Sequence, residues 1–161
     1  MKILFVCLGN ICRSPTVEGV ARALARREAP HLDVSFDSAG TADYHIGKPP
    51  DARSIRAAAA HGFDIADLRA RQVSAADFQD FDLLLAMDED NLRDLRGIAP
   101  RGYEDRAQLF LSYCGEAACA VPDPYYGGEE HFEQVLDLAQ TGVRALLRTL
   151  GAQYPARPGA G

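Results

Sequence analysis

The sequence has no apolar run long enough to cross a membrane, and its 161 residues include only four cysteines. A membrane span needs about 20 consecutive apolar residues, and a disulfide framework needs cysteines that are more numerous and more widely spread. The apolar start before Cys7 is also too short for a signal peptide and lacks a small-residue cleavage site. We therefore predict a cytoplasmic protein without membrane association.

A basic stripe is missing too. The net charge is −6, and the excess of acidic residues lies in the second half of the chain, which argues against nucleic acid as a partner. There is no internal repeat and no low-complexity segment. A content of 47% apolar and 25% charged residues suits one core. We predict a monomer with one domain over 1–154 and a disordered tail over 155–161.

Strand and helix patterns alternate along the chain. Patterns that suit strands cover 2–6, 32–38, 82–87 and 107–111, where 2–6 and 82–87 are apolar runs and 32–38 alternates apolar and polar residues. A long loop covers 39–50, and the final helical pattern runs from Phe132 to Leu150. Alternation of this kind favours parallel strands with right-handed crossovers. The predicted fold is α/β, a three-layer structure with a four-stranded parallel sheet flanked by helices and a phosphate-binding loop after the first strand.

The segment after the first strand combines a thiol with a turn that suits an anion. It reads Cys7-Leu8-Gly9-Asn10-Ile11-Cys12-Arg13-Ser14, with Pro15 next. Gly9 permits a tight turn, and Ser14 before Pro15 predicts a helix N-cap. Backbone N–H groups that point at one spot ahead of a helix favour a phosphate there and a thiolate at Cys7. A nucleophile and an anion cradle therefore coincide.

Phosphoryl transfer to a side chain also needs donors for the phosphate oxygens and an acid for the leaving group. Arg13 can grip two oxygens at once. Asp123 is the candidate acid, since it lies in a proline-stiffened loop after the fourth predicted strand and so at the same sheet edge as Cys7. Taken without the Cys7 turn, this loop would be an ordinary Asp-Pro turn.

The sequence resembles the low-molecular-weight protein tyrosine phosphatases over most of its length. The resemblance rests on the segment from Val6 to Pro15 and on Asp123-Pro124-Tyr125-Tyr126, with further landmarks at 38–41, 47–51, 71–72 and 87–92. It implies hydrolysis in two steps without metal or cofactor. Cys7 would form a phosphocysteine while Asp123 protonates the phenolate, and water would then attack with Asp123 as base.

The resemblance also assigns supporting roles. Asn10, Ser14 and Ser38 would form hydrogen bonds that shape the phosphate loop and steady the thiolate, although a turn asparagine and two capping serines would fit the same pattern. Cys12 would trap Cys7 as a reversible disulfide under peroxide, as an exposed reactive thiolate invites. A small buried loop residue is the other interpretation of Cys12.

Substrate choice should depend on the walls of the site, because the loop itself reads only phosphate. Tyr44 and Tyr125 would form a deep aromatic slot that leaves phosphoserine too short to reach Cys7, and Tyr126 would meet residues that flank the phosphotyrosine. Tyr44 could instead cover the core. The expected partners are phosphotyrosine proteins, either a tyrosine kinase or its targets.

Other functions remain open on the sequence. An arsenate reductase needs a thiol relay, but Cys114 and Cys119 lie in a different segment from that family's pair. A protein arginine phosphatase carries Thr where this chain has Ile11. A phosphotyrosine reader could dispense with its acid, and a redox sensor would need neither Arg13 nor Asp123.

Overall fold

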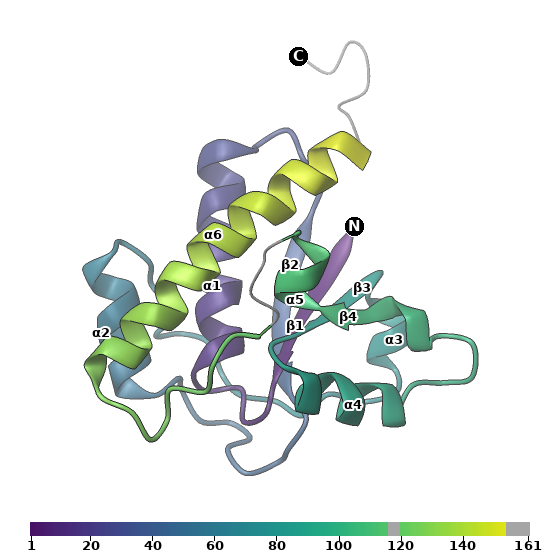
Figure 1. Ribbon diagram of the computed structural model, residues 1–161, viewed down its shortest axis with the longest axis horizontal. Helices are drawn as coiled ribbons and strands as arrows, with labels where there is room; N and C mark the ends of the chain where they lie inside the picture. The colour runs from purple at the N-terminus through teal and green to yellow at the C-terminus, as the bar shows by residue number, and fades with distance from the viewer. Residues whose placement is uncertain (116–119, 154–161) are drawn as a thin grey trace.

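The computed structural model describes residues 1–115 and 120–153 and contains one parallel sheet (Figure 1). Its strands are β1 (Lys2–Cys7), β2 (Ser35–Gly40), β3 (Leu83–Ala86) and β4 (Ala107–Leu109). Their order across the sheet is β2-β1-β3-β4, and each neighbouring pair is parallel. The predicted four-stranded parallel sheet is confirmed. Cys7 ends β1, a central strand, at the carboxyl edge of the sheet.

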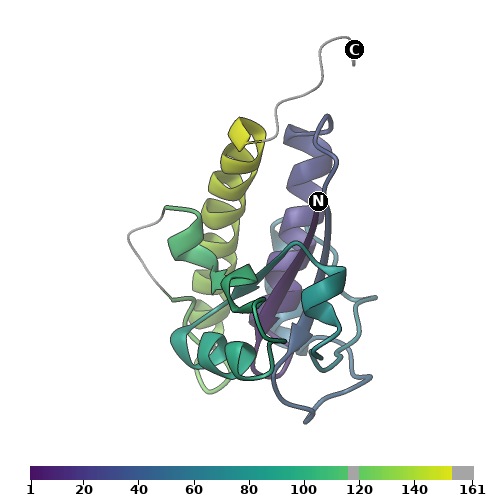
Figure 2. The same ribbon diagram turned by 90° about the vertical axis from the view of Figure 1, so that its right-hand side faces the viewer.

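Helices cover both faces of the sheet (Figure 2). They are α1 (Arg13–Glu28), α2 (Ala52–Ala60), α3 (Asp77–Asp80), α4 (Glu89–Gly97), α5 (Phe110–Tyr113) and α6 (Glu129–Gln153), with a 3-10 turn, η1 (Glu104–Arg106). One buried cluster joins the sheet to α1, α2, α5 and α6, and a second joins it to α3 and α4. This arrangement is the predicted three-layer structure.

The apolar run of β1 explains why both faces are covered. Successive side chains of a strand point to opposite faces, so Ile3 and Phe5 contact the α1 and α6 side while Leu4 and Val6 contact the α3 and α4 side. All four are fully buried. Such a continuous apolar run is typical of a parallel strand with helices on both sides.

The fourth strand is shorter than the predicted range 107–111. Phe110 and Leu111 begin α5, and both side chains lie in the cluster beneath α6. Two consecutive strand residues would point to opposite faces, whereas a helical turn lets both reach the same side. Gly142 of α6 makes room for them, because a Cβ at this position would lie 2.6 Å from Phe110 Cζ.

The second strand is displaced from its predicted range 32–38. It begins at Ser35 and continues to Gly40, which the sequence assigned to the loop, and Gly40 pairs with Cys7 across the sheet. In the described part of the chain no helix is both long and apolar enough for a membrane span. The predicted tail over 155–161 and Cys119 lie outside the described residues, and the domain limits stay a prediction.

Candidate active site

The turn between β1 and α1 is held from outside by neighbouring segments. Three of its carbonyl groups accept main-chain hydrogen bonds at 2.8–2.9 Å: Cys7 from Thr41, Leu8 from Ala42, and Ile11 from Asp51. In a trans peptide the carbonyl and the following N–H point in opposite directions. The N–H groups of Leu8, Gly9 and Cys12 therefore face the inside of the turn, as an anion cradle requires.

Two backbone features let the loop close tightly. Asn10 has φ +57°, a left-handed conformation that asparagine adopts more readily than most residues. Gly40 lies directly against the loop, because a Cβ at this position would lie 2.7 Å from the Leu8 carbonyl oxygen and 3.2 Å from the Asn10 nitrogen. A residue with a side chain at 40 would have to displace the loop backbone.

The thiol of Cys7 is buried at the centre of this loop. Its Sγ lies 3.0 Å from Ser14 Oγ and accepts a hydrogen bond from the Asn10 main-chain N–H at 3.3 Å. Asn10 Nδ2 in turn donates to Ser14 Oγ at 2.8 Å and to Ser38 Oγ at 2.9 Å. The three residues expected to support the nucleophile are thus brought together behind it.

Ser14 does not form the predicted N-cap. The helix begins two residues earlier than predicted, at Arg13, and its N-cap residue is Cys12, which makes no capping bond with its side chain. Pro15 remains within the first turn, where helical N–H groups need no carbonyl partner. The Ser14 hydroxyl is therefore free of a capping role and contacts Cys7.

Arg13 is held on its inner side by two acceptors. Its Nη1 donates to Asp88 Oδ2 at 2.6 Å and to the Val121 carbonyl at 3.2 Å, and its Nη2 lies 3.7 Å from Asp123 Oδ2. Burial works to lower the pKa of Arg13, but Cys7, Asp88 and Asp123 outweigh burial and raise that pKa. The guanidinium therefore keeps its charge in a buried place.

Asp123 reaches the site from the loop before α6. The Val121 N–H donates to the Met87 carbonyl at 2.8 Å, which fixes this loop to the end of β3. Asp123 Oδ1 accepts from the Tyr125 N–H at 3.1 Å, and Oδ2 faces Arg13. The candidate acid is half-exposed, so its second oxygen can meet a leaving group that enters from solvent.

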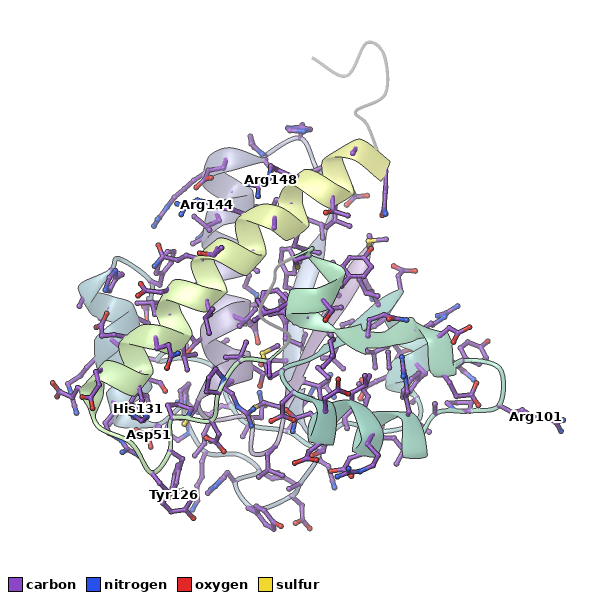
Figure 3. The ribbon with its side chains drawn as sticks, viewed as in Figure 1. Asp51, Arg101, Tyr126, His131, Arg144 and Arg148 are labelled. Carbon is purple, nitrogen blue, oxygen red and sulfur yellow. The ribbon has the colours of Figure 1, made fainter. Side chains whose placement is uncertain are left out.

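The predicted wall residues differ in how firmly they are held. Tyr125 is about one-third exposed, and the Arg53 guanidinium lies 5.5 Å from the centre of its ring. Tyr44 is 69% exposed, and the ring of His45 beside it comes within 3.0 Å of where a Cβ of Gly9 would lie. Tyr126 is 96% exposed and points into solvent from the loop tip (Figure 3). Tyr126 contacts the Tyr125 ring edge-on.

Cys12 lies buried at the start of α1. Burial raises the pKa of Cys12 to about 12, against a hydrogen bond with Ser54 that lowers it. The thiol therefore stays protonated at neutral pH. The expected disulfide with Cys7 stays a prediction. Among residues 1–115 and 120–153, no group of three or more His, Cys, Asp or Glu side chains could hold a metal ion.

Sequence reasoning left several contributors out of the site. Asp88 lies two residues after the end of β3 and caps α4, a position at the carboxyl edge of the sheet that could have indicated its contact with Arg13. Glu18 is an acid on the apolar face of α1 and accepts a hydrogen bond from Ser38 at 2.6 Å. Arg71 acts through its main-chain N–H, which donates to Asn10 Oδ1 at 3.0 Å. Any residue except proline could make this main-chain contact, so the residue type at 71 does not predict it.

Comparisons with known proteins show which proteins this chain is similar to. A family model described as low molecular weight phosphotyrosine protein phosphatase matches residues 2–156. The enzyme of that name from Gallus gallus is 42% identical over 148 residues, which are 91% of this chain and 93% of that one. YfkJ of Bacillus subtilis, a low molecular weight protein-tyrosine-phosphatase, is 40% identical over 93% of this chain and 96% of its own. The crystal structure of a protein tyrosine phosphatase from Entamoeba histolytica superposes with a TM-score of 0.89 at 37% identity, covering 95% of this chain and 98% of that one.

Proposed function

Because the chain belongs to the low molecular weight phosphotyrosine protein phosphatase family, we propose that Cys7, Arg13 and Asp123 carry out its reaction. The protein is a hydrolase that removes phosphate from phosphotyrosine by a cysteine-based mechanism. One observation carries the assignment to these residues. Arg13 is the first residue of the helix after the Cys7 loop, and its Nη2 lies 3.7 Å from Asp123 Oδ2. More than a hundred residues separate the two in the sequence.

In the first step, the Cys7 thiolate attacks phosphorus and forms an S–P bond while the bond from phosphorus to the phenolic oxygen breaks. The loop N–H groups and the Nε–Nη2 edge of Arg13 hold the equatorial oxygens, since Asp88 and Val121 already engage Nη1. Asp123 gives its proton to the departing phenolate. Tyrosine leaves, and a phosphocysteine remains.

In the second step, water attacks the phosphocysteine from the side that the phenol has left. Asp123, now a carboxylate, takes a proton from this water. The S–P bond breaks, its electrons return to sulfur, and inorganic phosphate leaves. Every proton and bond is accounted for by the chain and water, so the reaction calls for no metal or cofactor.

Specificity for an aryl phosphate follows from the depth of the buried thiol. Cys7 is only 2% exposed, so a phosphate must be carried inward on a long, flat group. Tyr44 and Tyr125 would stack on such a ring, with each contact contributing about 0.5–1.5 kcal/mol, and Tyr126 would meet flanking residues of the substrate. The natural substrates are phosphotyrosine proteins; we propose that they are a tyrosine kinase or its targets and that the enzyme acts as a monomer.

The test measures hydrolysis of p-nitrophenyl phosphate and of a phosphotyrosine peptide without metal. Cys7→Ser should abolish turnover, and Asp123→Asn should slow it by about 10²–10⁴-fold, the range that general acid–base catalysis contributes. Asp137→Asn on the exposed side of α6 is a matched control and should keep wild-type turnover.

Two results would contradict the assignment. Full activity of Cys7→Ser would exclude Cys7 as the nucleophile, and an Asp123→Asn variant as fast as the control would exclude Asp123 as the acid. Phosphoserine and phosphoarginine peptides belong in the same series. Equal turnover of either one would refute the role of the aromatic walls.

A further inference from the structure

Glu18 is a charged side chain buried behind the site, away from the substrate. It is 2% exposed and lies beside Val17 and Ala21, two core residues of α1. Its Oε1 lies 2.6 Å from Ser38 Oγ, and its Oε2 lies 2.9 Å from Arg22 Nη2. A buried carboxylate is costly unless it is paired and hydrogen-bonded, so a purely structural role would be served better by an apolar residue.

The hydrogen bonds between Glu18 and Cys7 form one buried chain, which runs through Ser38, Asn10 and Ser14. The direction of each bond follows from the donors. The main-chain N–H of Arg71 can only donate, so Asn10 Oδ1 must be the acceptor facing it. Asn10 Nδ2 then faces both serine hydroxyl oxygens and donates to each.

The two hydroxyl protons are thereby assigned. Ser38 Oγ accepts from Asn10, so its own proton is directed to the Glu18 carboxylate. Ser14 Oγ also accepts from Asn10, so its proton is directed to Cys7 Sγ at 3.0 Å; the other acceptor, the Ala39 carbonyl, is 3.5 Å away. Each N–H or O–H proton in the buried chain is thus directed to one acceptor, and the acceptor at the end of the buried chain is Cys7 Sγ.

We propose that Glu18 is a positioning residue for the reaction: by taking the Ser38 proton, it leaves the Ser38 oxygen to accept from Asn10, which holds the amide in the orientation that the Arg71 N–H also favours and keeps the Ser14 hydroxyl donating to the Cys7 thiolate. The proposal rests on the proposed role of Cys7 as nucleophile. Without an acceptor at 18, the buried Ser38 proton has no carboxylate to bond and opposes the Asn10 Nδ2 donor, so the Arg71 N–H alone must hold the amide in place.

Opposing influences act on the protonation of Glu18, and the ones that lower its pKa favour the accepting role. Burial raises the pKa of Glu18, and Asp37 on β2 acts in the same direction, while the hydrogen bond from Ser38 and the charges of Arg22 and Arg71 lower it. Arg22 is half-exposed, so it can balance the carboxylate charge from the solvent side. A protonated Glu18 would donate to Ser38 instead of accepting, which reverses the first bond of the buried chain.

The experiment compares three single variants and a double variant. Glu18→Gln keeps a carbonyl acceptor, Glu18→Met keeps length without an acceptor, and Ser38→Ala cuts the buried chain one step nearer to Cys7. The double variant combines Glu18→Met with Ser38→Ala. Glu28→Gln, on the same helix but exposed and paired with Arg144, is the matched control. The main measurement is the pH dependence of Cys7 alkylation by iodoacetamide, followed on the Cys7 peptide by mass spectrometry in a phosphine reductant.

Glu18→Met should move the alkylation midpoint to higher pH and slow alkylation at pH 6 by about 3- to 10-fold, the factor that one net hydrogen bond represents. Both kcat/KM and the alkylation rate should fall together. Glu18→Gln should recover most of the loss, and Glu18→Met should add nothing in the Ser38→Ala background, because Glu18 acts through Ser38. The control should match the wild type.

Three results would overturn the proposal: a wild-type alkylation profile in Glu18→Met, equal defects in Gln and Met variants, or additive effects of Glu18→Met and Ser38→Ala. If Glu18→Met does not fold, Ser38→Ala decides alone, since an unchanged profile there shows that cutting the buried chain has no effect on the thiol. Alkylation requires no turnover. A wild-type alkylation profile in Glu18→Met together with an inactive Cys7→Ser would refute the role of Glu18 alone. An active Cys7→Ser would refute the role of Cys7 as the nucleophile.

Discussion

Replacement of Gly40 by alanine tests how closely β2 and the phosphate loop depend on each other. The added Cβ would lie 2.7 Å from the Leu8 carbonyl oxygen, 3.1 Å from the Gly9 carbonyl carbon and 3.2 Å from the Asn10 nitrogen. All three atoms are main-chain atoms, so no side chain can rotate away to relieve the contact. The loop backbone has to move instead.

The size of the effect follows from this geometry. Overpacking typically costs about 1–3 kcal/mol, which corresponds to a fall in melting temperature of about 2–4 °C per kcal/mol for a chain of this length. The effect on kcat should be larger than the loss of stability implies, because a misplacement of about 1 Å in a catalytic site can cost about 10²-fold.

The assay combines p-nitrophenyl phosphate turnover with thermal unfolding. Gly97→Ala is the matched control, because Gly97 ends α4 and no atom outside its chain neighbours and the backbone of its own helix lies within 4 Å of the added Cβ. Alanine at this position should change stability by at most about 1 kcal/mol, toward higher stability. Wild-type turnover and melting temperature in Gly40→Ala would refute the reasoning, since the loop would then tolerate an atom where the geometry leaves no space.

Three further predictions concern charge and proton state. Iodoacetamide at pH 7 should label Cys7 before Cys12, because burial raises the pKa of Cys12 to about 12; peptide mass spectrometry checks the order. Asp88→Asn should lower kcat/KM by about 10- to 100-fold, as expected for a hydrogen bond to the charged Arg13; turnover of p-nitrophenyl phosphate measures it. Burial raises the pKa of Glu18 above its ordinary 4.5, so the folded state binds the extra proton and wild-type stability should fall, relative to Glu18→Gln, as pH rises from 4.5 through the folded-state pKa. Urea unfolding gives the free energy of unfolding of both proteins across that pH range, and a constant difference between wild type and Glu18→Gln would contradict the raised pKa of Glu18.

The sequence was sufficient to predict the layers and several of the residues that the structure brings together at the candidate site. Continuous apolar runs identify parallel strands covered on both faces, and the segment from Cys7 to Arg13 carries its chemistry in consecutive residues. The nearness of Asp123 to the Cys7 loop could be expected because Asp123 follows the last strand pattern and so lies at the same edge of the sheet. Each of these features depends on residue type and order, which the sequence states directly.

The missed features depend on contacts that residue types do not determine. Phe110 and Leu111 fit a strand as well as a helix, because two adjacent apolar residues have no period; only the position of α6 decides between them. Ser14 followed by Pro15 is typical of a helix start, yet the nearby thiol redirects its hydroxyl. The main-chain N–H of Arg71 would be the same with any residue except proline.

The position of β1 between β2 and β3 also determines which parts of the site open together. Residues 3–6 are fully buried between two partner strands, so their amide hydrogens should exchange with solvent only in the slowest, global openings. Asp123, the candidate acid, lies in a surface loop that the Val121 amide ties to the residue after β3, and surface loops belong to the segments that open at lower free energy. We therefore expect the loop that carries Asp123 to open while the cradle keeps its shape, so that bound phosphate would stay in place when the candidate acid is away. Hydrogen exchange would then record the two parts of the site as separate units.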